Sequence, residues 1–384
     1  VSDVAGLARL GLDVRHDPSA RTIDLVGCGG RIDAPEAEIY VGNSGTTVRF
    51  LTALLAAAGT GRYRLHGTPR MHERPIRDLI DALRSLGARV AGETESGCPP
   101  LIVEASGLSG GTASVRGDVS SQFLSGLLMA APLAKSPIRL EVAGELVSRP
   151  YVAMTLAVMR AFGVACPSDD LQRFTIPIGA YRGRTYEIEP DASAASYFFA
   201  AAAVTGGRVT VEGLSRRALQ GDVGFVDVLE RMGCEVSEST DGVTVAGPAR
   251  LRGVDVDMNA VSDTVQTLAP VALFADGPTT IRGVAHIRHK ETDRIRAVAV
   301  ELRKLGAAVD EFDDGLRIVP PAAGGRSLRG AAVDTYDDHR MAMSFSIAGL
   351  KIPGVEIRDP RCTHKTYPDF FADWGRLTGC AYDA

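Results

Sequence analysis

The stretch Leu302-Arg303-Lys304-Leu305-Gly306 decides the fold, because its pattern returns along the whole chain. Leucines three residues apart lie on one face of a helix, and a glycine directly after them can take the left-handed conformation that ends the helix. The same pattern ends at five other glycines: Gly11, Gly87, Gly163, Gly233 and, more weakly, Gly379. Successive copies lie about 70 to 76 residues apart, a near-constant period that indicates repeated supersecondary units.

A second pattern lies between these glycines. A short strand leads into a polar or glycine-rich turn, an apolar helix and another strand, so that each unit reads βαβαββ. The turns span residues 42–47, 119–122, 191–196, 261–264 and 337–340. The helices behind them, for example residues 198–204 and 341–350, are apolar nearly all round and are expected to be buried. Six such units predict an α/β fold.

The first copy keeps only the end of its helix and the strands that follow. Its opening strand and its buried helix would lie before Val1, so we expect the first repeat to be incomplete. Six full units would need about 440 residues, against the 384 of this sequence. We therefore expect the sequence to lack an N-terminal portion.

Composition argues against several classes of function. The formal net charge is -5 over 384 residues, with neither a basic stripe nor a basic amphipathic helix, so we expect no nucleic-acid or membrane partner. No apolar run is long enough to span a bilayer. The six cysteines are scattered without zinc-type spacing, which favours reduced thiols in a cytoplasmic protein. Nothing in the sequence calls for a metal or an organic cofactor.

The stretch Lys290-Glu291-Thr292-Asp293-Arg294 packs two cations and two carboxylates into five residues. On a helix, Lys290 and Arg294 share a face, and Glu291 lies one step round from Lys290. Paired cations beside an acid suit an anionic substrate that gains or loses a proton. The alternative is a solvated face of ion pairs, which is common in proteins.

The polar turns before the buried helices are a second candidate site. Free backbone N–H groups and the positive end of the helix dipole bind anions at such positions. If the units pack around pseudo-threefold axes, several of these helix ends converge on one place. The alternative is that the Ser, Asp and Asn residues of the turns act only as N-caps.

Eight short blocks of sequence follow one another along the chain. They are Gly42-Asn43-Ser44-Gly45-Thr46 with Arg49, Pro69-Arg70-Met71-His72-Glu73-Arg74-Pro75, Val119-Ser120-Ser121-Gln122-Phe123, Ser148-Arg149-Pro150-Tyr151, Asp191-Ala192-Ser193, Lys290 to Arg294, Asp338-His339-Arg340-Met341-Ala342-Met343, and Lys365-Thr366 before Tyr367-Pro368-Asp369. Together they resemble the 5-enolpyruvylshikimate-3-phosphate synthase (3-phosphoshikimate 1-carboxyvinyltransferase) family over essentially the whole chain.

The resemblance implies two domains of three βαβαββ units each, which close on substrate in the cleft between them. Residues 1–184 would form the domain on the shikimate 3-phosphate side, and residues 185–384 the domain on the phosphoenolpyruvate side, with the catalytic carboxylates. The implied reaction transfers the enolpyruvyl group of phosphoenolpyruvate to the 5-hydroxyl of shikimate 3-phosphate and releases phosphate. It belongs to the biosynthesis of aromatic amino acids.

The resemblance also implies residues for both substrates. Those for phosphoenolpyruvate are Asn43, Gly45, Arg70, Gln122, Arg294, Arg340 and Lys365. Those for shikimate 3-phosphate are Ser120, Ser121, Gln122, Ser148, Tyr151, Asp263, His286 and Lys290. His286 stands where many members carry Asn. Arg49 and Arg74 are either ligand residues or members of surface or inter-element ion pairs.

The catalytic residues that the resemblance implies are Asp263, Glu291, Lys290 and His339. Asp263 would act at the attacking hydroxyl and Glu291 at the methylene carbon of phosphoenolpyruvate. Addition gives a tetrahedral ketal phosphate, and loss of phosphate and a proton gives the enol ether. His339 would lie near the departing phosphate, where a capping or core role is the alternative.

One feature of the family has no counterpart between Val1 and Ala384. It is a Gly-Ser-Lys-Ser-type segment near the N-terminus, whose Lys-Ser pair and a nearby Arg contact both substrates. We expect this segment to precede Val1 in the native protein, and we expect the polypeptide from Val1 to Ala384 to be poorly active without it.

Two other functions are alternatives. The sister enolpyruvyl transferase that acts on UDP-N-acetylglucosamine shares the six-unit plan, but it uses a loop cysteine as acid, and no cysteine here lies in a comparable Arg-bearing loop. The other alternative is a non-catalytic anion-binding protein on the same scaffold. We expect a monomer whose partners are the two small-molecule substrates.

Overall fold

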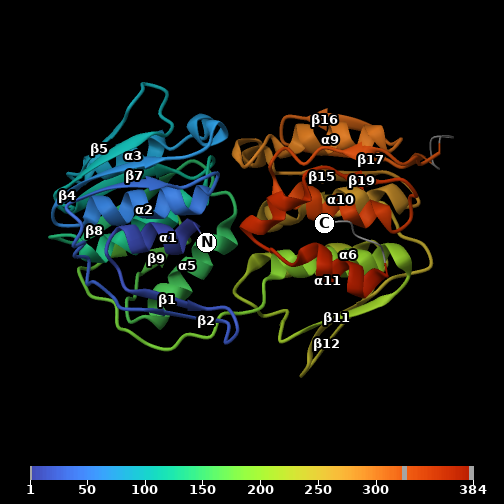
Figure 1. Ribbon diagram of the computed structural model, residues 1–384, viewed down its shortest axis with the longest axis horizontal. Helices are drawn as coiled ribbons and strands as arrows, with labels where there is room; N and C mark the ends of the chain where they lie inside the picture. Colours follow the sequence, from blue (N-terminus) through green and yellow to red (C-terminus); the bar gives the residue numbers. More distant parts are fainter. Residues whose placement is uncertain (1, 322–326, 380–384) are drawn as a thin grey trace. The chain divides into compact units, whose positions relative to one another are not determined.

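The computed structural model describes residues 2–321 and 327–379 of the chain. Contacts divide the chain into two compact units, Val1–Tyr186 and Glu187–Ala384. Each unit has its own hydrophobic core, and Figure 1 labels some of the elements of each. The boundary expected from the sequence falls slightly earlier, between residues 184 and 185.

The first unit contains two four-stranded sheets and a hairpin. Its elements are α1 (Ser2–Arg9), β1 (Val14–Asp17), β2 (Thr22–Leu25), β3 (Glu36–Tyr40), α2 (Gly45–Ala57), β4 (Gly61–His66), η1 (Pro69–Glu73), α3 (Arg77–Ser85), β5 (Arg89–Gly92), β6 (Leu101–Ala105), β7 (Gly111–Arg116), α4 (Ser121–Ala130), η2 (Ala131–Leu133), β8 (Ile138–Ala143), α5 (Arg149–Ala161), β9 (Ser168–Asp169) and β10 (Arg173–Ile176). The sheets have the orders β3-β4-β6-β5 and β7-β8-β10-β9.

The second unit contains one four-stranded sheet and two smaller ones, in the orders β14-β15-β17-β16, β11-β13-β12 and β18-β19. Its elements are α6 (Ala192–Thr205), β11 (Arg208–Glu212), η3 (Gly221–Gly224), α7 (Phe225–Arg231), β12 (Glu235–Ser239), β13 (Gly242–Ala246), β14 (Asp255–Asp257), η4 (Asn259–Thr264), α8 (Val265–Val271), η5 (Ala272–Phe274), β15 (Thr279–Arg282), η6 (Ala285–His289), α9 (Arg294–Lys304), β16 (Ala308–Phe312), β17 (Gly315–Val319), β18 (Ala332–Val333), α10 (His339–Gly349), β19 (Glu356–Ile357), η8 (Pro360–Lys365) and α11 (Phe370–Thr378).

All three four-stranded sheets follow one scheme. The first two strands of each pair in parallel, because a buried helix crosses between them, and the remaining strands pair antiparallel. The predicted βαβαββ order is thus confirmed for three copies within the described residues. The other copies carry part of it: the hairpin β1-β2, the strands β11 to β13, and the parallel pair β18-β19.

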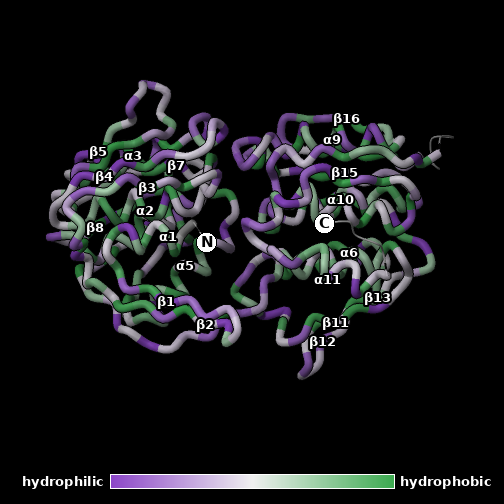
Figure 2. Tube along the Cα trace, in the orientation of Figure 1, coloured by the Kyte–Doolittle hydropathy of each residue, from purple (hydrophilic) through white to green (hydrophobic). Residues whose placement is uncertain are grey.

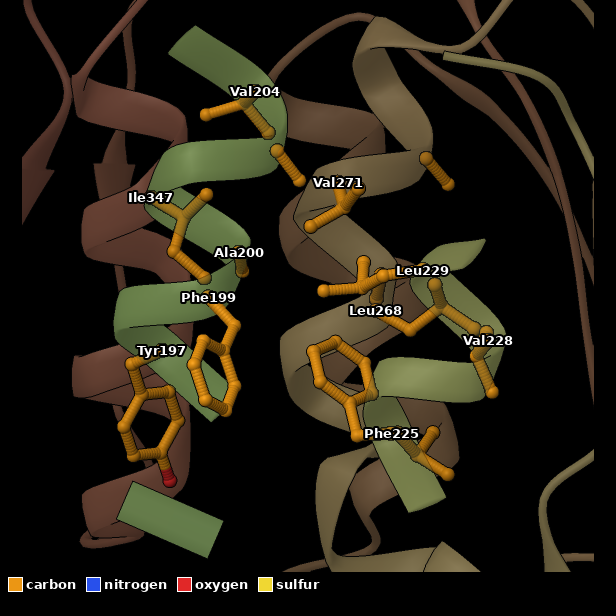
Figure 3. Close-up of a cluster of buried hydrophobic side chains, with 14 of the residues drawn as sticks. Tyr197, Phe199, Ala200, Val204, Phe225, Val228, Leu229, Leu268, Val271 and Ile347 are labelled. Atoms are coloured by element: carbon orange, nitrogen blue, oxygen red, sulfur yellow. The ribbon is translucent and has the colours of Figure 1, made fainter. Parts of the chain in front are cut away.

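The apolar helices are buried, as predicted. Helices α2 and α4 pack together in the first unit, and α6, α8 and α10 pack on one another in the second. Figure 3 shows Phe199 of α6, Leu268 of α8 and Ile347 of α10 within this second group. In Figure 2 hydrophobic residues run along these interior helices, while the outer loops are mostly hydrophilic.

The six repeat glycines end their helices as predicted. All have positive φ, from 70° at Gly379 to 107° at Gly233. At five of them the next residue donates its N–H to the carbonyl five positions earlier, as Ala88 does to Leu83 at 3.0 Å. This is the Schellman arrangement, which pairs carbonyls that the helix end would leave free. Gly379 instead donates to the carbonyl of Gly375 at 2.9 Å.

Five cysteines in the described part of the chain are free thiols, whereas Cys380 lies outside it. Within the same residues, no helix combines the length and the apolar character that crossing a bilayer demands.

Gly233→Ala should lower the free energy of unfolding by about 1 to 2 kcal/mol, because alanine would have to adopt the left-handed conformation. The nearest atom to an added Cβ is 3.6 Å away, so the cost comes from the backbone alone. Urea unfolding followed by circular dichroism measures it. Gly349→Ala is the control: Gly349 ends α10 with 3.8 Å to its nearest neighbour, and alanine should leave stability equal or higher there. Equal losses in both variants would contradict the role of the repeat glycine.

Candidate active site

The charged stretch before α9 is not helical throughout. Helix α9 begins at Arg294, because the side chain of Asp293 caps it by accepting a hydrogen bond from the Arg296 N–H at 3.0 Å. Lys290 ends the preceding 3₁₀ turn, η6. The prediction that Lys290 and Arg294 share a helical face is therefore wrong. An aspartate in this position favours a helix start over a helix interior, since its side chain competes for backbone N–H groups.

Arg294 nevertheless lies at the centre of a charged cluster. Its guanidinium donates to three carboxylates: Nε to Asp338 at 2.8 Å, Nη1 to Asp263 at 3.0 Å and Nη2 to Glu291 at 2.9 Å. Arg294 is 1% exposed. Burial by itself lowers the pKa of Arg294, but the three carboxylates outweigh burial and raise it above its ordinary value. The guanidinium is therefore a permanent charge that fixes three acids around one point. The alternative of a solvated ion-pair face is wrong for this residue.

Each of the two predicted catalytic carboxylates has a second cation beside it. Asp263 accepts from Arg340 Nη2 at 2.9 Å, and Lys290 Nζ lies 3.8 Å from its other oxygen. Glu291 accepts from Lys365 Nζ at 2.8 Å. Burial raises the pKa of Asp263, but the charges of Arg340, Lys290 and Arg294 outweigh burial and hold it below its ordinary value. Asp263 is therefore ionised at neutral pH.

The N-terminal ends of α6, α8 and α10 meet at this cluster, as packing of the repeats predicts. Arg340, the second residue of α10, reaches Asp263 before α8 and Ser193 in the first turn of α6, at 2.9 and 3.5 Å. The N-cap alternative also holds: Asp191 and Asp338 cap α6 and α10 through their side chains. Caps and converging helix ends thus occur together.

Three residues of the cluster, Asp338, Ser193 and Tyr197, are not among the site residues predicted from the sequence. Asp338 is fully buried, caps α10 by accepting from the Arg340 N–H at 2.9 Å, and holds Arg294. Ser193 and the Tyr197 hydroxyl accept from Arg340. Two of these positions carry a signal in the sequence. Asp338 stands directly before an apolar helix, and Tyr197 is the single tyrosine of an alanine-rich helix.

Two histidines lie next to the charged cluster and are neutral. Burial lowers the pKa of His286 to about 3, assisted by the nearby charge of Lys290. Burial also lowers the pKa of His339 to about 4, although Asp338 opposes this shift. His339 opens α10, and its Nδ1 lies 3.8 Å from Asp338 Oδ1. Both imidazoles can exchange hydrogen bonds with a ligand, but neither adds a positive charge at pH 7.

The first unit has a second polar cluster at the N-terminus of α2. Ser44 caps this helix by accepting from the Thr47 N–H at 3.2 Å. Arg74 Nη1 donates to the carbonyl oxygen of Asn43 at 2.7 Å and to its side-chain oxygen at 3.1 Å. An added Cβ on Gly45 would overlap the Arg74 guanidinium. Gly45 is therefore required by a buried arginine of the protein itself, in addition to any ligand.

Gln122 connects the N-termini of α4 and α2. It accepts from Arg49 Nη1 at 2.7 Å and donates to Thr46 Oγ1 at 3.0 Å. The Arg49 guanidinium lies over the ring of Phe123, 5.0 Å from its centroid. Arg49 and Arg74 are 2% and 3% exposed, so the surface alternative is wrong for both. They support the polar turn from inside.

The remaining predicted residues of the first unit lie on three helix starts. Ser120 caps α4, accepting from the Gln122 N–H at 3.3 Å, and Ser121 is buried beside it. Ser148 precedes α5 in a left-handed conformation (φ 54°), with Tyr151 in the first turn. Arg70 lies on η1 and pairs with Glu73 at 2.9 Å.

The cluster of the second unit carries a positive surplus. It comprises four cations (Lys290, Arg294, Arg340, Lys365) and three carboxylates (Asp263, Glu291, Asp338). The chemistry of such a cluster suits an anion and two separate carboxylates that can carry protons.

The fold defines the class of protein. The structure resembles that of EPSP synthase from Acinetobacter baumannii, with a TM-score of 0.77, 24% identity, and coverage of 98% of this chain and 86% of that one. It also resembles the enolpyruvyl transferase NikO from Streptomyces tendae, with a TM-score of 0.75, 22% identity, and the same two coverages. The fold is that of the enolpyruvyl transferases.

Sequence comparison identifies the family within this class. The family model for EPSP synthase (3-phosphoshikimate 1-carboxyvinyltransferase) matches residues 2–374. The 3-phosphoshikimate 1-carboxyvinyltransferase of Nostoc punctiforme is 50% identical over 95% of this chain and 84% of the relative. The chloroplastic enzyme of Brassica napus is 50% identical over 95% of this chain and 73% of the relative. The chain belongs to the EPSP synthase family, which is a family of transferases.

The neutral state of His286 should make the protein sensitive to acid. The folded pKa of about 3 lies below the ordinary value of 6.5, so between these values the unfolded chain binds the extra proton. The free energy of unfolding should then fall as the pH falls, by about 2 kcal/mol from this residue between pH 7.5 and pH 5. We expect the free energy of unfolding of His286→Asn, measured with urea, to fall by about 2 kcal/mol less than that of the wild type over the same pH range.

His364→Asn, which removes an exposed histidine of the same unit, is the control and should keep the wild-type loss. If His286→Asn and His364→Asn lose stability in parallel with the wild type, the burial of a neutral His286 is not the cause.

Proposed function

We propose that this protein transfers the enolpyruvyl group of phosphoenolpyruvate to the 5-hydroxyl of shikimate 3-phosphate and releases phosphate, in the biosynthesis of aromatic amino acids. Membership of the family supports the reaction. The observation that carries the assignment is the cluster in which Arg294 holds Asp263 and Glu291, each with a second cation beside it. This arrangement separates two proton-transfer groups around a site that favours anions.

Asp263 and Glu291 have distinct parts in the proposed addition. Asp263, ionised because of its three cations, accepts the proton of the attacking hydroxyl as its oxygen bonds to C2 of phosphoenolpyruvate. Glu291, acting from its protonated form, delivers a proton to the methylene carbon, which becomes a methyl group. The product is a tetrahedral ketal phosphate. In the elimination, the C2–O bond to phosphate breaks, the methyl group returns a proton to Glu291, and the proton held by Asp263 leaves with the phosphate. This gives the enol ether and restores both carboxyl groups to their starting states.

Arg340 and Lys365 are the strongest candidates for binding phosphoenolpyruvate in the second unit. Their side chains are 13% and 28% exposed, so an incoming carboxylate or phosphate can reach them. Arg294 is buried and fully engaged with carboxylates, and it would contribute by exchanging one of them for a substrate oxygen. In the first unit we assign Asn43, Gly45, Arg70 and Gln122 to the same substrate.

Shikimate 3-phosphate is assigned to the helix starts of the first unit. Ser120, Ser121 and Ser148 offer hydroxyl and backbone donors to its phosphate, with Gln122 and Tyr151 beside them. In the second unit, Asp263, Lys290 and His286 are assigned to its hydroxyls. We assign His339 to the departing phosphate, as a neutral hydrogen-bonding group because its pKa is about 4.

We further propose a monomeric protein of the cytoplasm. The free cysteines favour a reducing compartment, because oxidising ones pair thiols into disulfides. Light scattering coupled to size exclusion tests the oligomeric state.

Phosphate release with each acceptor tests the proposed reaction. The protein, expressed from its full native reading frame, should release phosphate from phosphoenolpyruvate when shikimate 3-phosphate is present. Asp263→Asn should lower kcat by about 10²- to 10⁴-fold, the range of general acid–base catalysis. Asp276→Asn, which alters an exposed carboxylate paired with Arg250, is the matched control and should leave kcat unchanged.

Release only with UDP-N-acetylglucosamine would assign the sister reaction instead. Binding of phosphoenolpyruvate without release for either acceptor would assign a non-catalytic anion-binding protein.

Gly45→Ala tests the polar turn of the first unit. The added Cβ would overlap Arg74 and lie 3.1 Å from Arg49 Nη1, so the turn before α2 must shift. We expect KM for phosphoenolpyruvate to rise about tenfold, which corresponds to about 1.4 kcal/mol, while KM for shikimate 3-phosphate changes little. Gly59→Ala, with no neighbour within 4 Å of the added Cβ, is the control. An unchanged KM for phosphoenolpyruvate in Gly45→Ala would contradict the assignment of this turn.

A further inference from the structure

The segment between β18 and α10 has an unusual backbone. Tyr336 and Asp337 are consecutive non-glycine residues, and the backbones of both lie in the left-handed region, with φ of 56° and 54°. A residue with a Cβ adopts this region at a cost, and two in succession persist only where surrounding contacts hold them. The next residue is Asp338, which caps α10 and binds Arg294. The conformation of this pair therefore sets the position of a carboxylate in the proposed active site.

Helix α9 holds the segment at two places. Arg294 and Glu301 are seven residues apart, two turns of helix, and so lie on the same face of α9. Arg294 binds Asp338. Glu301 binds the other end of the segment: its Oε1 accepts from the Tyr336 hydroxyl at 2.6 Å, and its Oε2 accepts from the Asp334 N–H at 3.2 Å.

Glu301 is kept in place by charge. It is fully buried, and Lys304 Nζ lies 2.8 Å from its Oε2. Lys304 also pairs with Asp334 at 2.7 Å, and Arg358 pairs with the other Asp334 oxygen at 2.9 Å. Burial, followed by the hydrogen bond to Glu301, raises the pKa of Tyr336, so its hydroxyl stays protonated and remains the donor. A buried carboxylate with this set of partners is a rigid anchor.

We propose that Glu301 and Tyr336 are positioning residues of the active site, in a clamp that holds the left-handed pair Tyr336–Asp337 and thereby keeps Asp338 on Arg294 and Arg340 on Asp263. The link from Asp338 to Arg340 is direct, because Asp338 Oδ1 accepts from the Arg340 N–H at 2.9 Å. Glu301 and Tyr336 are not among the residues assigned to either substrate, and we propose that they act through Asp338. This inference rests on the proposed function for its kinetic consequence, but its structural part stands independently.

Tyr336→Phe tests the clamp with little disturbance of packing. Tyr336 is 40% exposed, so loss of its hydroxyl removes a hydrogen bond without leaving a buried cavity. Hydrogen exchange is the first readout. The amides of Asp334, which donates to Glu301, and of Arg340, which donates to Asp338, should exchange at least fivefold faster in the variant. This measurement requires no substrate.

Kinetics give the second readout. KM for phosphoenolpyruvate should rise about five- to tenfold in Tyr336→Phe, because Arg340 loses its fixed position, while KM for shikimate 3-phosphate changes less than twofold. Tyr63→Phe is the matched control: it removes a phenol hydrogen bond to the Ala34 carbonyl (2.8 Å) in the first unit, and should change neither KM nor the two amides.

A second variant tests whether backbone strain is the cause. Glycine adopts positive φ as readily as negative φ, so Asp337→Gly removes the steric cost at one of the two positions. In the Asp337→Gly background, Tyr336→Phe should raise KM for phosphoenolpyruvate less than threefold. If Tyr336→Phe raises KM for phosphoenolpyruvate five- to tenfold in both backgrounds, the clamp is overturned as the mechanism.

Three further results decide the inference. If the wild type turns over and Tyr336→Phe changes neither amide exchange nor KM, the clamp is overturned. If Tyr336→Phe lowers the melting temperature but changes neither amide exchange nor KM, its role is structural and the positioning role is overturned. If the wild type fails to turn over, the proposed function fails, and faster exchange at Asp334 and Arg340 would still support the clamp.

Discussion

The buried guanidinium of Arg294 is the interaction on which the second unit depends. One residue holds Asp263, Glu291 and Asp338, which come from three separate segments of the chain. A buried arginine without carboxylates would be unstable, and three buried carboxylates without a cation would repel each other and take up protons. Each charge is therefore tolerated only because the others are present. Removal of Arg294 would leave the fully buried carboxylate of Asp338 without the arginine that pairs with it, so the cluster depends on this one residue.

Repetition of one supersecondary unit explains how such distant residues meet. Five copies each place a polar turn before a buried helix, and α6, α8 and α10 pack on one another, so their first turns come together at Arg340, Asp263 and Ser193. The positive ends of these helices add to the charge of the arginines. The repeat thus supplies an anion-binding environment through its backbone, and the side chains of individual copies supply the differences that chemistry requires.

Arginines serve two separate purposes in this protein. Arg49 and Arg74 are buried in the first unit and bind neutral groups, Gln122 and Asn43, so they fix the shape of a turn. Arg340 and Lys365 are partly exposed and pair with Asp263 and Glu291, so a substrate anion can compete for them. Local sequence does not distinguish these two uses, because Arg74 and Arg340 both stand in charged or polar segments. Burial distinguishes them.

The repeat, the buried helices, the glycine helix ends and the family could all be predicted before any coordinates, because they follow from local periodicity and from motifs that are short and contiguous. Prediction failed where two local signals compete, as at Asp293, whose capping side chain starts α9 at Arg294 and excludes Lys290 from the helix. The packed chain was needed to show that Asp338 and Glu301 hold opposite ends of one segment, and that Arg49 and Arg74 are interior. These facts depend on which side chains share a buried space, and burial is a property of the packed chain that no local stretch of sequence contains.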